Sequence, residues 1–156
     1  MIRMAATFFV LGALMDSASA DMKYLSIGKI ASVTLGPGKP AEVVVPVIVA
    51  KEFHVQANPA SSPRLIATTL EVSGTDALKA GTPVYPAGKA YKLQGAAMEI
   101  SVYDGKFEIK VPLFAQASVK SGRHELKGKL RFQACNDKIC FFPMNIPVTI
   151  PVTVQK

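Results

Sequence analysis

The sequence has few charged residues and no long apolar run, and each shortage excludes a class of protein. Charged residues make up 19% of the 156 residues and hydrophobic residues 49%, so general disorder is excluded and one packed domain is expected. The formal net charge is +7, but the densest basic stretch, residues 127–131, alternates with apolar residues as a strand face does. Nucleic acid is therefore not expected as a partner.

No apolar run approaches the roughly 20 residues that a membrane span needs. At the N-terminus, Arg3 precedes an apolar stretch over residues 4–15, and Ala18-Ser19-Ala20 offers the small residues of a cleavage site. This pattern predicts a signal peptide over residues 1–20, cleaved after Ala20, and a mature domain over residues 21–156. No cysteine follows the apolar stretch, which disfavours a lipid anchor. We expect an exported, periplasmic protein without stable membrane insertion after cleavage, in a compartment where disulfides persist.

The mature sequence alternates apolar and polar residues with the period of β-strands. Val-rich residues 43–49 predict a central strand buried on both faces, and Pro147 and Pro151 place the last strand at a sheet edge. No window beyond the signal peptide shows a helical stripe. Strands are predicted over residues 31–35, 43–49, 65–72, 106–111, 126–135 and 148–154. This spacing, about seven short strands, favours an all-β, immunoglobulin-like antiparallel β-sandwich, with a closed barrel as the alternative.

The two cysteines, Cys135 and Cys140, are separated by four residues that include the turn pair Asn136-Asp137. A hairpin with a four-residue loop would place the cysteines opposite each other. Their Cα atoms would then lie about 4.5 to 5.5 Å apart, which a disulfide can bridge.

Such a bond is either a structural staple or a reactive pair, and three features favour reactivity. The closed loop is short, so the bond stabilises the fold by only about 2 kcal/mol. The alternation places Cys135 with Lys127, Lys129 and Arg131 on the solvent-facing side of the preceding strand. Lys138 and Arg131 would also favour the thiolate over the thiol.

A metal site is the sharper alternative, formed by the two cysteines with His54 and His124. However, the cysteine spacing is at the edge of the usual zinc range, and neither histidine belongs to a ligand-type repeat. A hydrolase is weaker still, because no Gly-x-Ser-x-Gly elbow or Ser-His-Asp order is present. We expect neither a metal nor a cofactor.

Several segments, in order along the chain, resemble one known family. They are residues 53–61 with Leu65-Ile66, residues 85–89, 102–105 and 111–113, and most specifically residues 128–140 with Pro143 after them. These segments are similar to the N-terminal periplasmic domain of the thiol:disulfide interchange protein DsbD, over nearly all of the mature chain. The resemblance implies an immunoglobulin-like fold and a thiol:disulfide oxidoreductase of the protein-disulfide reductase type. Its cysteine pair would relay electrons from a thioredoxin-like donor to oxidised periplasmic proteins.

The resemblance also implies roles for residues near the pair. The C-terminal cysteine, Cys140, would form the mixed disulfide with partners, although the residues alone do not say which cysteine attacks. Asn136, Asp137, Lys138 and Phe142 are expected to support the pair.

The chain departs from the family's pattern in two places. Family members shield the pair with an aromatic residue on a cap loop, whereas residues 90–98 carry Gly95-Ala96-Ala97 at that place. Either Tyr91 or Met98 replaces the aromatic residue, or the pair is unshielded. Full-length members continue into a transmembrane domain and a thioredoxin-like domain, whereas this chain stops at Lys156. We therefore expect a detached, monomeric module. The alternative is a non-catalytic immunoglobulin-like adaptor whose disulfide pins a hairpin.

Overall fold

The computed structural model describes residues 23–92 and 98–156. These residues form twelve strands and no helix. In the described ranges, no helix is therefore long and apolar enough to span a membrane. The predicted signal peptide and its cleavage after Ala20 lie outside the described residues.

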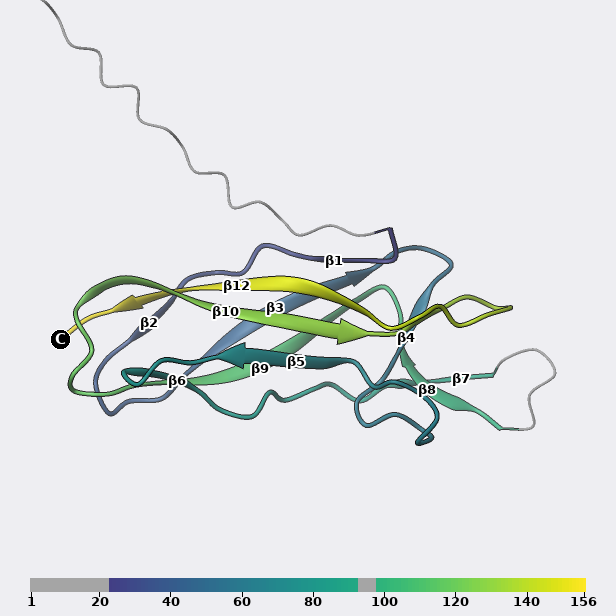
Figure 1. The fold of residues 1–156 in the computed structure, drawn as a ribbon, viewed down its shortest axis with the longest axis horizontal. Coiled ribbons are helices and arrows are strands. Elements are labelled where there is room, and N and C mark those ends of the chain that lie inside the picture. The colour runs from purple at the N-terminus through teal and green to yellow at the C-terminus, as the bar shows by residue number, and fades with distance from the viewer. Residues whose placement is uncertain (1–22, 93–97) are drawn as a thin grey trace, which may run out of the picture.

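The strands form three four-stranded sheets, which pack as an immunoglobulin-like β-sandwich with a smaller sheet at one end (Figure 1). The first sheet has the order β1 (Leu25–Ile27), β3 (Ala41–Val49), β9 (Lys106–Ala115), β6 (Leu78–Ala80). The second has the order β2 (Val33–Leu35), β12 (Met144–Val154), β10 (Gly122–Phe132), β5 (Thr69–Ser73). The third has the order β11 (Ala134–Cys135), β4 (His54–Gln56), β8 (Ile100–Tyr103), β7 (Lys89–Tyr91).

The core lies between the long strands, whose apolar residues alternate with polar ones. In β9 the residues that point inward are Phe107, Ile109, Val111, Leu113 and Ala115, all buried. β3, β10 and β12 show the same period. Burying each large aliphatic side chain contributes about 1.5 to 3 kcal/mol, so this core holds the sandwich together.

The third sheet is built from continuations of the other two. β4 follows β3 in the chain, β8 leads into β9, and β11 follows β10. Figure 1 shows β4, β7 and β8 gathered at the end of the molecule away from the C-terminus. Segments that continue from the first and second sheets therefore pair with each other in the third sheet, whose strand β11 contains Cys135.

The predicted fold class is confirmed, and several element predictions need correction. The structure has twelve described strands rather than about seven. Five of them have three residues and one has two, and such short strands give little periodic signal in the sequence. β3 is an inner strand, but only one of its faces is buried: Ile48 is exposed, since the outer face of the first sheet meets solvent.

The last strand is also placed differently from the prediction. β12 lies between β10 and β2, although β2 pairs only with Val152–Val154. Its partner strand β2 runs parallel to it, whereas the other paired strands are antiparallel. β10 pairs along one edge of β12. Along the other edge only Val152–Val154 pair with β2, so Pro147 and Pro151 do not pair with it.

Candidate functional site

The two cysteines face each other across a hairpin, as predicted. Cys135 and Cys140 are antiparallel bridge partners and are joined by a disulfide. Their Cα atoms are 4.0 Å apart, slightly closer than predicted. The chain has no other cysteine, so the disulfide chemistry of this domain is confined to this hairpin.

Asn136 forms the turn that connects the cysteines. Its backbone N–H donates to the carbonyl oxygen of Ile139 at 3.0 Å. Its side-chain Oδ1 accepts from the backbone N–H groups of Lys138 at 2.9 Å and Ile139 at 2.8 Å. An asparagine at the start of a turn favours this arrangement because its short side chain replaces a backbone acceptor.

The base of the hairpin is tied to the rest of the fold by Gln133 and Phe141. The Phe141 N–H donates to the Ala134 carbonyl at 2.8 Å, and Gln133 Nε2 donates to the Phe141 carbonyl at 3.1 Å. Gln133 Oε1 accepts from the N–H of Ile66 at 3.2 Å. The Phe141 ring stacks on Tyr24, with centroids 4.7 Å apart. The turn thus projects from an anchored base.

The two cysteines differ in exposure, which corrects the prediction that Cys135 faces solvent with the basic residues. Cys135 has an exposed fraction of 0%, whereas Cys140 is exposed. The predicted alternation assumed one strand over residues 126–135. Instead, β10 ends at Phe132 in the second sheet, and after Gln133 the chain pairs with β4 in the third sheet. The parity of β10 therefore does not extend to Cys135.

Two polar side chains of β4 lie on the same face as Cys135. Cys135 is the cross-strand partner of His54, and Gln56 is two residues further along β4. Gln56 Nε2 donates a hydrogen bond to Cys135 Sγ at 3.4 Å. Both β4 side chains are buried, and among the described residues His54 Nε2 and Gln56 Oε1 have no hydrogen-bond partner. The buried sulfur thus lies in a polar niche.

The Tyr91 ring packs against the His54 ring beside this niche. The two rings lie 4.2 Å apart between centroids. Burial lowers the pKa of His54, and the negative charge of Asp104 opposes this change. A neutral imidazole is therefore favoured beside Cys135.

The structure describes Tyr91 and Met98, the two residues considered as a replacement for the aromatic shield. Tyr91 packs against His54, the neighbour of Cys135, whereas Met98 is exposed. Gly95-Ala96-Ala97 lies outside the described residues. Cys140 itself remains exposed at the end of the domain.

The exposed cysteine is flanked by apolar side chains. Ile139 is exposed immediately before it, and Phe142 has an exposed fraction of 91% two residues after it. Asp137 and Lys138 are exposed at the tip of the turn, and Arg131 is exposed on β10. A partner that approaches Cys140 would meet an apolar rim with charged groups beside it.

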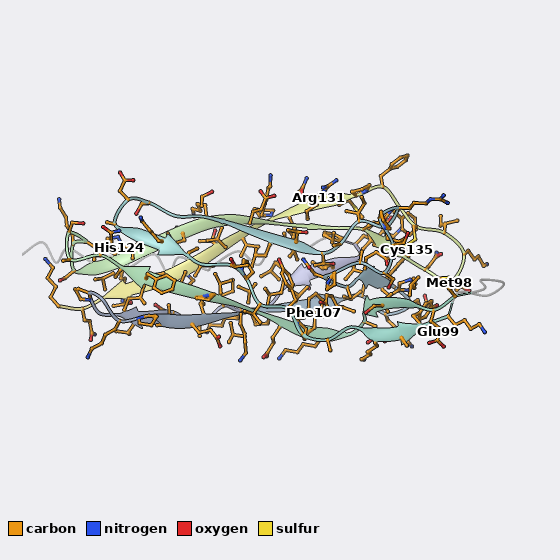
Figure 2. The ribbon with its side chains drawn as sticks, turned by 90° about the horizontal axis from the view of Figure 1, so that it is seen from below. Met98, Glu99, Phe107, His124, Arg131 and Cys135 are labelled. Carbon is orange, nitrogen blue, oxygen red and sulfur yellow. A yellow bond between two sulfur atoms is a disulfide. The ribbon has the colours of Figure 1, made fainter. Side chains whose placement is uncertain are left out.

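The residues considered for a metal site do not come together. His54 lies beside Cys135, but His124 lies at the opposite end of the molecule from Cys135 (Figure 2). Within residues 23–92 and 98–156, no group of three or more His, Cys, Asp or Glu side chains could hold a metal ion.

Sequence reasoning did not place His54 and Gln56 beside Cys135. Their spacing of two in a β-rich segment could have placed them on one face. Their partner could not be read from the sequence, because β4 and β11 are far apart in the chain and have three and two residues.

Comparison with known proteins adds a family and a fold. The family described as "Thiol:disulfide interchange protein DsbD, N-terminal" matches residues 22–150. No curated protein sequence matches the chain.

Two of the similar solved structures are N-terminal domains. The N-terminal domain of Neisseria meningitidis DsbD in the reduced form has 18% identity and a TM-score of 0.46, over 71% of this chain and 77% of that chain. The N-terminal periplasmic domain of Proteus mirabilis ScsB has 11% identity and a TM-score of 0.56, over 86% of this chain and 50% of that chain. The chain thus spans half the length of the ScsB domain, and this second likeness shows the fold.

Proposed function

Because this chain belongs to the family of the DsbD N-terminal domain, we propose that it relays electrons through Cys135 and Cys140 in the periplasm. The donor would be a thioredoxin-like protein, and the acceptors would be oxidised periplasmic proteins. The observation that carries this proposal is the disulfide itself, which has one exposed and one buried cysteine on an anchored hairpin.

Exposure supports Cys140 as the sulfur that reacts with partners. A thiolate of the donor attacks Cys140 Sγ and forms a donor–Cys140 disulfide, while the Cys135–Cys140 bond breaks and its electron pair stays on Cys135. The second donor thiolate then attacks the donor's own sulfur and releases Cys140. The donor leaves as a disulfide, and the pair holds two electrons and takes up two protons.

The second half of the cycle uses the same sulfur. The two thiols of the pair give up their protons, which the two acceptor sulfurs take up as they are released. The Cys140 thiolate attacks the disulfide of an acceptor, and one acceptor sulfur leaves as a thiolate. Cys135 then attacks Cys140, which reforms the original disulfide and releases the second acceptor thiolate. The exposed Phe142 and Ile139 would contact the partner, and Asn136 would hold the two sulfurs within reach of each other.

Trapping with single-cysteine variants tests this assignment. Cys135→Ser keeps Cys140 without its resolving thiol and should accumulate a mixed disulfide with a thioredoxin-like partner. Cys140→Ser should trap far less, because Cys135 is buried. Equal trapping by both variants would contradict the role of Cys140.

A second candidate function is a non-catalytic immunoglobulin-like adaptor with a structural disulfide. The complete burial of Cys135 favours it, because buried cysteines are commonly inert. Failure of both single variants to trap any partner would support this adaptor.

The proposal includes export. Residues 1–20 would be a signal peptide, and residues 21–156 would be the mature domain in the periplasm. N-terminal sequencing of the exported protein should start at Asp21, whereas a cytoplasmic protein that retains Met1 would contradict both the location and the redox role.

A further inference from the structure

The buried sulfur of Cys135 poses a chemical problem for the proposed exchange. When a thiolate attacks Cys140, Cys135 Sγ is the leaving group and takes the electron pair of the broken bond. Burial disfavours a charged thiolate because it removes the charge from water. A hydrogen-bond donor directed at this sulfur would reduce that cost.

Gln56 places such a donor at the sulfur. Its Nε2 lies 3.4 Å from Cys135 Sγ, and the side chain has an exposed fraction of 0%. Disulfide sulfur is a weak acceptor. A thiolate in the same place carries a full negative charge, and hydrogen bonds to charged groups are about twice as strong as neutral ones.

The backbone around Gln56 is fixed. Its carbonyl oxygen accepts two hydrogen bonds from Thr68, from the backbone N–H at 3.2 Å and from Oγ1 at 2.6 Å. Thr68 is itself buried. His54 lies on the same face of β4, and its ring contacts Tyr91. The amide thus lies in a buried site on a fixed backbone, with its Nε2 already at the sulfur, as preorganised stabilisation of a developing charge requires.

We propose that Gln56 is a catalytic residue of the exchange, whose side-chain amide donates a hydrogen bond to the Cys135 thiolate as the Cys135–Cys140 bond breaks. The attacking thiolate forms the new bond to Cys140, and the electron pair of the old bond moves to Cys135 Sγ. The Gln56 N–H then donates a hydrogen bond to the negatively charged sulfur. The choice of Cys140 as the attacked sulfur rests on the proposed function. The contact between Gln56 and Cys135 does not.

The pKa of the Cys135 thiol tests this role directly. In a Cys140→Ser background Cys135 is the single thiol, and its titration can be followed by the ultraviolet absorbance of the thiolate. Gln56→Met removes the donor and keeps a side chain of similar shape. We expect this substitution to raise the pKa of Cys135 by about one unit or more.

The rate of disulfide reduction is the second measurement. In the oxidised two-cysteine protein, reduction by dithiothreitol should slow about tenfold or more in Gln56→Met. Gln56→Asn keeps the amide but withdraws it by one methylene, and it should change both quantities in the same direction. This second variant decides the matter if Gln56→Met does not fold.

Ile150→Val is the matched control for lost stability. It removes one methylene group from a fully buried side chain of β12 in the second sheet and leaves Gln56 and Thr68 in place. It should lower the stability of the fold without changing the Cys135 pKa or the rate. A purely structural role for Gln56 would give the same pattern in all three variants.

The outcomes separate this inference from the proposed function. If the wild type exchanges with a thioredoxin-like partner but neither Gln56 variant raises the pKa or slows reduction, the role of Gln56 is wrong and the function stands. If Gln56 controls both quantities but no partner exchanges with the wild type, the inference stands and the proposed function is wrong.

Discussion

Cys135 and Cys140 are bridge partners with Cα atoms 4.0 Å apart, yet one is fully buried and the other is exposed. Cys135 belongs to β11, which pairs with β4, and its sulfur contacts Gln56, whereas Cys140 follows the projecting turn. Since access is one of the factors that decide which sulfur a thiolate attacks, the pair offers one accessible sulfur.

The fold should not depend on the disulfide. The double variant Cys135→Ser, Cys140→Ser should lose about 2 kcal/mol of unfolding free energy, because the bond closes a short loop. A typical domain has about 5 to 15 kcal/mol, so urea unfolding should still show one cooperative transition. Electron transfer to a thioredoxin-like protein should be abolished. A double variant that is unfolded in the absence of urea would instead support a structural staple.

Asn136 should keep the pair closed. Asn136→Ala removes the acceptor of two backbone hydrogen bonds in the turn. A net loss of about 1 kcal/mol would shift the equilibrium with a reference dithiol about fivefold toward the reduced pair. Asn145→Ala removes the side chain of an exposed asparagine on β12, outside the turn, and should leave this equilibrium almost unchanged. Equal shifts in both variants would show that the Asn136 turn has no special role.

The hairpin could be predicted from the sequence, whereas the surroundings of its buried cysteine could not. The spacing of the cysteines and the Asn136-Asp137 pair are local signals, and they gave the correct pairing. The switch of sheet at Gln133 depends on β4, about 80 residues earlier in the chain, so the local alternation gave the wrong side for Cys135.

The same limit applies to the sheets. The alternation over residues 106–111 is strong because β9 has one face on the core along its whole length. β4, β7 and β11 have two or three residues, too few for a period to be recognised. The smaller sheet that carries the site was therefore not predicted.

Phe142 should act in partner binding and not in folding. With 91% of its surface exposed, Phe142→Ala should change stability by less than about 0.5 kcal/mol. Exchange with a thioredoxin-like protein should slow, while reduction by dithiothreitol should not. The matched control is Phe114→Ala, an exposed phenylalanine on β9 beside β6, away from the third sheet (Figure 1). A similar loss of exchange in both variants would contradict a contact specific to Phe142.

Acid should weaken the fold through His54. Because burial lowers the pKa of His54 in the folded state, the unfolded chain binds a proton at higher pH than the folded chain does. The contribution of this residue to stability is therefore fully present above the unfolded value of about 6.5 and is lost as the pH falls below it. The charge of Asp104 reduces the effect.

Urea unfolding at neutral and mildly acidic pH measures this dependence. Carboxylates also titrate below neutral pH, so the relevant quantity is the difference between wild type and His54→Gln at each pH. The loss of stability on acidification should be smaller in His54→Gln than in wild type. Identical losses would show that His54 does not resist protonation in the fold.

The reduction potential of the Cys135–Cys140 pair tests the central claim most directly. It can be measured by equilibrating the domain with glutathione or dithiothreitol at a series of ratios and quantifying the two free thiols by alkylation and mass spectrometry. A pair that relays electrons should have a potential well above about −300 mV, so that thioredoxin-like proteins can reduce it. A value below about −300 mV would identify a structural disulfide and contradict the proposed relay.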